Sequence, residues 1–263
     1  MNDASLLFDV ADGVVTLTLT LNRPRTKNAL TRELVTDLGD RLEAVGTDPS
    51  VRVVVLTGAE GAFCSGADLK VAMADPDAAR TAAPALEAYH RVIRAIASIP
   101  QPVIAAVDGP AVGFGCDLAL ACDMRWLSDR AYLQEKFVRI GLMPDGGGTL
   151  WLTRALGLGR ALEIMLTGRR VEAEEAFSLG LANRVVPAGE LASAVGSLAG
   201  ELAKGAPMAM AAIKRAARGA LEGSLEDALA AEREGQLENL ASADFIEGVQ
   251  AWLQKREPRF SGR

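Results

Sequence analysis

Apolar and polar residues alternate along residues 14 to 21, VVTLTLTL, a pattern that predicts a half-buried strand. Residues 51 to 57, VRVVVLT, and 102 to 109, PVIAAVDG, are nearly continuous apolar runs and predict buried strands. Residues 86 to 99 have helical spacing. Thr31 is a plausible N-cap for a further helix, whose apolar face comprises Leu34, Val35, Leu38, Leu42 and Val45. The alternation of strand and helix predicts a layered α/β core.

Beyond about residue 145 the pattern becomes mainly helical. We expect helices near 149–156, 160–166 and 172–179 and one short strand near 183–186. From Leu191 onward, Ala-, Leu- and Glu-rich stretches predict three helices, with breaks at 205–207 and near Gly223. Such helices cannot bury both faces alone, so they should pack on the core or on another subunit.

Composition and charge narrow the functional classes. The 263 residues are 49% hydrophobic, enough for a sizeable core, and 28 Lys and Arg against 34 Asp and Glu give a net charge of −6. An acidic chain has no global attraction to nucleic acid or to anionic membranes. No apolar stretch approaches the roughly 20 residues needed to cross a bilayer, and no signal segment opens the chain. We therefore expect a cytoplasmic protein without nucleic-acid or membrane partners.

The cysteine and histidine content argues against several kinds of site. Cys64, Cys116 and Cys122 are odd in number and lack C-x-x-C spacing, so neither a disulfide framework nor a thiolate metal site is indicated. His90 is the only histidine, and it lies at the edge of an apolar helical stripe. We interpret His90 as a packing or surface residue and Cys64 and Cys116 as small core residues, and we expect no metal.

Residues 111 to 123, AVGFGCDLALACD, place one carboxylate, Asp117, in an otherwise apolar run. The glycines do not complete a dinucleotide fingerprint, because the third glycine of G-x-G-x-x-G is replaced by Leu118. A second glycine-rich stretch at 144–149, PDGGGT, lacks the G-K-[ST] of a P-loop. Taken singly, both stretches are consistent with ordinary tight turns.

A set of motifs in one order changes this assessment. The chain contains LNRPRTKNALT, FCSGADL (63–69), AVDGPAVGFGCDLALACD (106–123), IGLMPDGGGT (140–149), TGRRVEAEEAFSLGLANRVVP (167–187) and the terminal EGVQAWLQKREPRFSGR. Together, from about Phe8 to Arg263, they closely resemble the crotonase family of enoyl-CoA hydratases and isomerases. The resemblance implies a spiral of ββα units over residues 1–200 and a C-terminal helical region, 201–263, for oligomerisation and CoA contact. It also implies a homotrimer or a dimer of trimers, with coenzyme A present only as part of the substrate and no separate cofactor.

Members of this family stabilise the enolate of an acyl-CoA thioester. By resemblance, the two backbone donors to the enolate oxygen are the amides of Ala67, in SGAD, and Phe114, in GFG. Backbone donors lose no side-chain entropy, and Gly66 and Gly113 would let the thioester approach them closely. A helix beginning near Phe114 also points its positive end toward that oxygen.

Asp117 lies three residues after Phe114, so a helical turn brings its carboxylate to the same end of the segment. Apolar neighbours should raise its pKa and make it a better proton carrier. Family members often have a catalytic Glu here, so the shorter Asp is a departure. The alternative is a buried structural Asp satisfied by backbone donors.

A second departure concerns the hydration machinery. The family's hydratases hold water between two glutamates, and the position of the second is occupied here by Phe137, which cannot relay a proton. Glu135 is two residues away, and we expect it to substitute only if the local backbone is shifted.

Asp145 matches an aspartate of the family's isomerases. With Asp117 it could remove a proton from C2 or C4 of the acyl chain and return it at the other end of the allyl system, without water. The alternative for Asp145 is the N-cap of the following helix. These considerations favour an enoyl-CoA isomerase. A hydratase with rearranged acid and base groups, or a non-catalytic acyl-CoA-binding or RNA-binding relative, are the alternatives.

The remaining site candidates follow from the resemblance. Near the CoA nucleotide we expect Lys27, Lys70, and Lys255 with Trp252 on the last helix, which often serves a neighbouring subunit; solvated surface lysine is the alternative. Other positions matched to substrate contacts are Ala29, Ser65, Gly66, Asp68, Gly113 and Phe137. Asp68, Asp108 and Asp123 also suit turns and caps. RNA-binding relatives carry a lysine-rich helix. This chain has only a short basic patch, made of Lys214, Arg215 and Arg218.

Overall fold

The computed structural model describes residues 4–11, 15–74, 76 and 78–263. Its larger sheet has six strands in the order β1-β2-β3-β4-β6-β9, of which only β1 and β2 pair antiparallel. A smaller sheet has the order β5-β7-β8. The strands are β1 (Leu6–Ala11), β2 (Val15–Leu21), β3 (Val51–Gly58), β4 (Val103–Val107), β5 (Pro110–Val112), β6 (Met124–Ser128), β7 (Tyr132–Gln134), β8 (Val171–Glu172) and β9 (Arg184–Val186).

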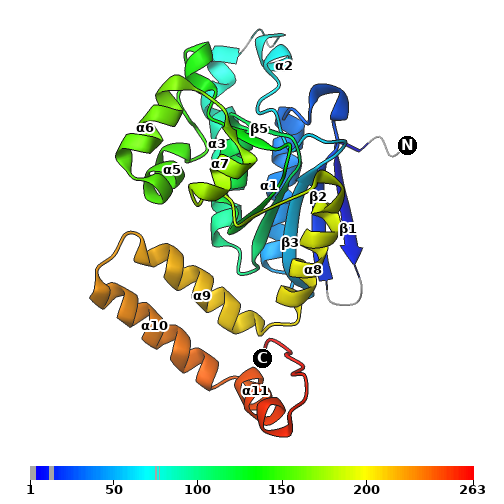
Figure 1. The fold of residues 1–263 in the computed structure, drawn as a ribbon, viewed down its shortest axis with the longest axis vertical. Helices are drawn as coiled ribbons and strands as arrows, with labels where there is room; N and C mark the ends of the chain where they lie inside the picture. Colours follow the sequence, from blue (N-terminus) through cyan, green and yellow to red (C-terminus); the bar gives the residue numbers. More distant parts are fainter. Residues whose placement is uncertain (1–3, 12–14, 75, 77) are drawn as a thin grey trace.

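Helices cover both faces of the larger sheet and extend beyond it (Figure 1). They are α1 (Arg32–Gly46), α2 (Leu69–Ala74), α3 (Ala78–Ser98), α4 (Phe114–Ala121), α5 (Gly148–Leu156), α6 (Leu158–Thr167), α7 (Ala173–Ser178), α8 (Leu191–Ala203), α9 (Pro207–Ala220), α10 (Leu225–Leu240) and α11 (Ala243–Gln254). Short 3₁₀ turns lie at Pro24–Thr26, Phe137–Ile140 and Ala188–Glu190. No helix in these described ranges is long and apolar enough to span a membrane.

The continuous apolar runs are explained by burial on both faces of β3 and β4. Along β3, Val54 and Leu56 face the main core formed with α1 and α3, while Val53 and Val55 face a second core under α8. A parallel strand covered on both sides has no polar face, so the sequence has no alternation there. The α1 cap is also as expected, because the Thr31 side chain accepts a hydrogen bond from the Leu34 amide.

The chain differs from the sequence expectations in three places. The predicted helix at 86–99 begins earlier, at Ala78, and β1, β5, β6, β7 and β8 were not anticipated, four of them only two to five residues long. Four helices, not three, follow residue 190, because the last stretch breaks at Ala241. Ser242 caps the next helix there by accepting a hydrogen bond from the Phe245 amide. The strand expected at 14–21 is present as β2, from Val15 to Leu21. Residue 14 lies outside the described residues.

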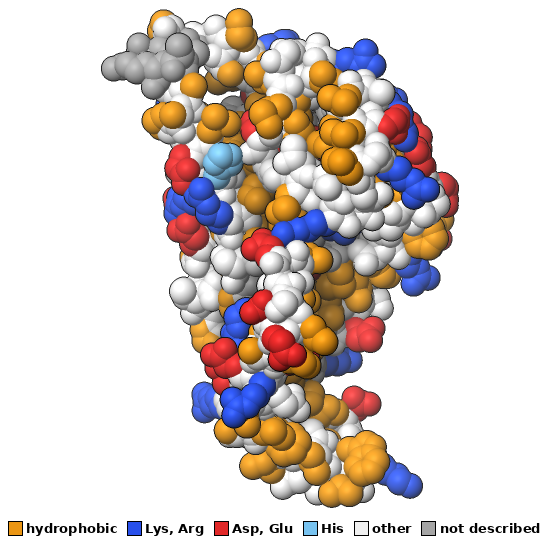
Figure 2. All heavy atoms as spheres, turned by 90° about the vertical axis from the view of Figure 1, so that its left-hand side faces the viewer, with side chains coloured by type: hydrophobic (Ala, Val, Ile, Leu, Met, Phe, Trp, Pro, Cys, Tyr) orange, Lys and Arg blue, Asp and Glu red, His pale blue; other side chains and the backbone are white. Residues whose placement is uncertain are grey.

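Helices α9, α10 and α11 project away from the two sheets (Figure 1). Many apolar side chains on them are exposed, and Figure 2 shows hydrophobic side chains gathered at this lower end of the molecule. Examples are Ile213, Leu225, Leu237, Phe245, Ile246 and Trp252.

Candidate active site

Two segments that are distant in sequence run side by side where the small sheet meets α4. The Cys64 amide donates a hydrogen bond to the Pro110 carbonyl at 3.0 Å, and the Val112 amide donates to the Cys64 carbonyl at 2.9 Å. Gly66 has a φ of +87°, and a Cβ there would lie 2.8 Å from the Val112 carbonyl oxygen and 3.5 Å from the Phe114 nitrogen. Glycine is therefore needed at this crossing, which brings the SGAD turn against the start of α4.

The amides of Ala67 and Phe114 lie on the two sides of this crossing. The Ala67 segment is held from outside, since the Leu30 amide donates to the Gly66 carbonyl at 2.8 Å and the Asp68 amide donates to the Leu30 carbonyl at 2.9 Å. Within the described chain, neither the Ala67 nor the Phe114 amide donates to another backbone group. Both N–H groups remain available to an acceptor from outside the chain.

A cavity of about 670 Å³ opens beside Ala67. It lies between α1, α2 and α3, and its walls are mostly apolar with a few charged residues at the edge. The residues that line it include Leu30, Val35, Ala67, Lys70, Val71 and Tyr89. A cavity of this size and character is typical of small-molecule sites.

Aromatic rings enclose the Phe114 side of the site. Tyr89 packs edge-on against Phe114, with the ring centroids 4.5 Å apart. The ring of buried Phe137 lies 3.7 Å from the place a Cβ would occupy at Gly113. Burial raises the pKa of the Tyr89 hydroxyl, so this side of the site has a low dielectric. Phe137 contributes packing at the position where the family's hydratases carry a glutamate.

Asp117 is completely enclosed. Its Oδ2 accepts a hydrogen bond from the Gly146 amide at 2.9 Å, whereas Oδ1 has no hydrogen-bond partner. Desolvation raises the pKa of Asp117 to about 7; the Gly146 hydrogen bond opposes this rise and the Asp145 charge adds to it. Asp117 thus accepts a backbone hydrogen bond, as the structural alternative expects, and burial raises its pKa, as expected from its apolar neighbours.

Glu135 is a buried acid that lies beside Asp117. β5 and β7 pair in regular register through Val112 and Gln134, and Glu135 follows directly, so the local backbone is not shifted. That Glu135 replaces the second glutamate of the hydratases only with a shifted backbone stays a prediction. Lys136, between Glu135 and Phe137, has φ −85° and ψ 0°, so the backbone turns there, and both flanking side chains are buried. Both carboxyl oxygens of Glu135 are buried without a hydrogen-bond partner. Desolvation and the neighbouring Asp117 raise its pKa well above the usual range.

Asp145 lies in the turn before α5. It is not the helix N-cap, since α5 begins at Gly148 and Gly147 occupies the cap position. Its Oδ1 is buried without a hydrogen-bond partner. Burial raises the pKa of Asp145, and the charge of His90 opposes the shift. His90 is partly exposed on α3, as expected for a surface position, and its Nδ1 lies 3.9 Å from a carboxylate oxygen of Glu87.

The substrate-contact candidates near the start of the chain gather around the SGAD turn. Lys27 has a left-handed backbone, and its carbonyl accepts a hydrogen bond from the Ser65 amide at 3.0 Å. Ala29 is buried next to this contact. The Asp68 carboxylate pairs with Arg23 at 3.0 Å and accepts from the backbone of α2, so it serves the turn. Lys70 is exposed and lines the 670 Å³ cavity.

Trp252 and Lys255 are not brought to this site by their own chain. Both are exposed at the end of α11, which lies at the opposite end of the molecule from α2 (Figure 1).

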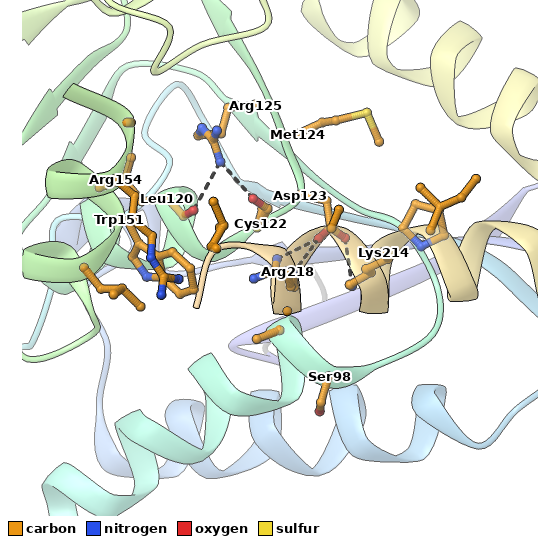
Figure 3. Close-up of a pocket in the computed structure, with 18 of the residues that line it drawn as sticks. Ser98, Leu120, Cys122, Asp123, Met124, Arg125, Trp151, Arg154, Lys214 and Arg218 are labelled. Atoms are coloured by element: carbon orange, nitrogen blue, oxygen red, sulfur yellow. Dashed lines mark hydrogen bonds and ion pairs between the residues drawn. The ribbon is translucent and has the colours of Figure 1, made fainter. Parts of the chain in front are cut away.

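A second cavity, of about 840 Å³, lies at the far end of α4, between the sheet and α9 (Figure 3). Asp123 is its central acid, and it pairs with Lys214 at 2.8 Å and with Arg218 at 2.6 Å. Asp123 therefore does more than cap a turn, because it fastens α9 to the core. Lys214 and Arg218, two of the three residues of the predicted basic patch, therefore form ion pairs with Asp123.

Cys64 and Cys116 are buried and free, as expected of core residues, and Cys122 is buried and free as well. Burial raises the pKa of Cys64 and of Cys122 to about 12, so neither is a reactive thiolate. Asp108 pairs with Arg130 and accepts from Ser128, which agrees with a structural role.

Comparison with known proteins agrees with this geometry. The sequence model of the enoyl-CoA hydratase/isomerase family matches residues 11–263. Over all 263 residues the chain is 40% identical to the whole of a protein named "Probable enoyl-CoA hydratase" from Rhodobacter capsulatus. It is 38% identical to the 1,2-epoxyphenylacetyl-CoA isomerase of Escherichia coli, with 98% of each chain covered. The crystal structure of an enoyl-CoA hydratase from Bacillus anthracis superposes with a TM-score of 0.95 at 34% identity, covering 99% of this chain and 100% of that one. The chain belongs to the enoyl-CoA hydratase/isomerase family and has the crotonase fold.

Proposed function

We propose that this protein is an enoyl-CoA isomerase that moves a double bond between C3 and C2 of an acyl-CoA thioester. The proposal is carried by two observations together: Oδ1 of Asp145 is buried without a hydrogen-bond partner, and position 137 holds a buried phenyl ring. The first is suited to proton transfer, and the second replaces an acid that hydration requires. Similarity to relatives does not decide the matter, because they carry both hydratase and isomerase names.

The thioester oxygen would accept hydrogen bonds from the Ala67 and Phe114 amides. One carboxylate removes a proton from C2, the negative charge spreads onto the thioester oxygen, and a carboxylic acid returns a proton at C4. We assign these two roles to Asp145 and Asp117, whose raised pKa values suit proton exchange near neutral pH. The proton count is unchanged, so no water is consumed.

The rest of the substrate would be held by residues matched to the family. Lys70 lines the 670 Å³ cavity and Lys27 adjoins Ser65, and both would pair with CoA phosphates. Trp252 and Lys255 would act from a neighbouring copy, which fits a homotrimer or a dimer of trimers. In this proposal the thioester supplies its own CoA and no further cofactor takes part.

The test replaces Asp145 by Asn. A 3-enoyl-CoA is supplied and formation of the conjugated thioester is followed by its absorbance. We expect isomerisation to fall by about 10²-fold or more, because an amide cannot transfer the proton, while acyl-CoA binding measured by calorimetry is retained. Asp37→Asn, at an exposed position on α1, is the matched control. Unchanged isomerisation in Asp145→Asn would remove Asp145 from the mechanism.

A second candidate, enoyl-CoA hydratase, is favoured by one observation: Glu135 lies beside Asp117, so two carboxyls are present together. The same assay separates the two activities. Rapid loss of conjugated absorbance when a 2-enoyl-CoA is incubated with the enzyme would support hydration and overturn the preference for isomerisation. Saturable CoA-thioester binding without turnover of either substrate would support a binding protein.

A further inference from the structure

Asp117 and Glu135 converge on one point. A Cβ added at Gly148 would lie 2.3 Å from Asp117 Oδ1 and 2.9 Å from Glu135 Oε1. Both side chains are fully buried, and these same two oxygens, with Glu135 Oε2, have no nitrogen or oxygen donor as partner. The Cys116 thiol lies close enough to Glu135 to act as a weak donor, but it does not reach all three oxygens. Buried carboxyl oxygens are rarely left unsatisfied, so this group of three requires an explanation.

The surroundings supply no balancing cation. The ionisable groups that face the pair are Cys116 on α4 and Asp145 in the turn before α5. From α3, only His90 and Tyr89 approach, and they face Asp145. In the part of the chain that the structure describes, no salt bridge reaches Asp117, Glu135 or Asp145. Two like charges in one dry site cannot both be ionised without such a partner, so a proton must balance the pair.

We propose that Asp117 and Glu135 share one proton, and that Glu135 is a positioning residue that acts through Asp117 on the turn carrying Asp145. The proton resides on Glu135 and is donated to Asp117 Oδ1, which gives both oxygens a partner. At pH 8 Asp117 is the anion of the pair and accepts a hydrogen bond from the Gly146 amide through Oδ2. The pair carries one negative charge in total. The effect of Glu135 on catalysis by Asp145 rests on the proposed function, whereas the shared proton is independent of that function.

This arrangement explains the glycines of the turn. A side chain at Gly148 would occupy the space between the two carboxyls, and a Cβ at Gly146 would lie 2.5 Å from that of Asp117. The turn therefore closes directly over the acid pair. Loss of the shared proton would place two repelling anions beneath it, whereas a neutral hydrogen-bond donor at position 135 would keep it closed.

Infrared difference spectroscopy tests the proton directly and requires no turnover. At pH 8 the wild-type protein should show the C=O stretch of a protonated carboxylic acid. Glu135→Gln should lose this band, and Glu190→Gln, at an exposed position, should keep it. A band of equal intensity in the wild type and Glu135→Gln would overturn the proposal, as would its absence from the wild type.

Hydrogen exchange at residues 145–148 tests the positioning role. Glu135→Gln retains a donor toward Asp117 and should keep the wild-type protection, whereas Glu135→Leu should exchange at least tenfold faster. Equal protection in Glu135→Leu and the wild type would refute this role, whether or not the protein turns over an enoyl-CoA.

The pH profile of isomerisation separates positioning from space filling. We expect kcat of Glu135→Leu to fall by on the order of 10- to 100-fold with little change in KM, because Asp145 is displaced. Glu135→Gln should lose the alkaline limb of the profile, since it has no shared proton to release. A Glu135→Gln profile that keeps the wild-type alkaline limb would contradict proton sharing. If the wild type shows the infrared band but no isomerisation, the proposed function fails and the shared proton stands.

Discussion

At the scale of single residues, Gly148 is constrained by the acids behind it. Its φ is not in the left-handed region, so the constraint is the space taken by Asp117 Oδ1 and Glu135 Oε1. This differs from Gly66, where the backbone conformation and a close carbonyl both require glycine.

Gly148→Ala should therefore be damaging. The added methyl group must displace at least one buried carboxyl, and we expect a loss of stability of about 1–3 kcal/mol together with at least tenfold lower kcat. Thermal unfolding and the isomerase assay measure the two effects. Gly159→Ala on α6 is the matched control, since nothing lies within 4 Å of its new methyl group and helix propensity improves. Equal stability of the two variants would show that the acids have room to move.

At the scale of elements, one partly buried acid, Asp123, attaches α9 to the core. Asp123 accepts from the Val103 amide at 2.9 Å and binds Lys214 and Arg218, and Lys214 is only 9% exposed. Lys214 also donates to two carbonyls at the end of α3, those of Ile96 and Gln101. Desolvation lowers the pKa of Lys214, so its charge is tolerated only because these acceptors surround it.

Asp123→Ala should loosen this attachment. Removing the acid leaves a buried ammonium without its counter-ion, and we expect the protein to lose about 3–5 kcal/mol of stability. Proteolysis at the α8–α9 junction should also become faster, which gel electrophoresis would detect. Glu238→Ala breaks the exposed pair with Arg215 and should cost less than about 1 kcal/mol. Similar losses in the two variants would contradict the anchoring role of Asp123.

Sequence reasoning succeeded where the determinants are local. The Thr31 cap and the apolar face of α1 lie within one stretch, and β3 and β4 are continuous apolar runs. It failed where tertiary pairing decides: β5 and β7 are three residues each and exist because they pair with each other. The burial of Glu135 beside Asp117 was not predicted for the same reason, because Glu135 follows β7 and its surroundings depend on that pairing.

At the scale of the whole molecule, the buried acids make stability depend on pH. The folded-state pKa of Asp117, about 7, is above its ordinary value of 3.8. As pH rises, the unfolded chain therefore releases this proton at a lower pH than the folded protein does. Over the interval between the two pKa values, the free energy of unfolding falls. Stability from this group is fully present below pH 3.8 and is lost as pH rises through about 7. Asp145 and Glu135, whose pKa values are also raised, act in the same direction.

Carboxylates on the surface act in the opposite direction at a different pH. Ion pairs and hydrogen bonds lower the pKa of Glu247, to about 2, and also that of Asp108. Their stabilisation is present above the unfolded pKa and is lost only in acid. Between pH 6 and 8.5 these groups are ionised in both states, so the buried acids dominate the carboxylate contribution.

We therefore expect the wild-type protein to unfold at a lower temperature at pH 8.5 than at pH 6. Between pH 6 and the folded-state pKa of about 7, ionisation of Asp117 lowers the free energy of unfolding by ~1.4 kcal/mol. This loss corresponds to a fall in melting temperature of a few degrees. Asp117→Asn cannot ionise, so its melting temperature should change less over the same range. Scanning calorimetry of both proteins measures the difference. A wild-type melting temperature that rises from pH 6 to pH 8.5, or an equal slope in Asp117→Asn, would show that Asp117 is already ionised at pH 6.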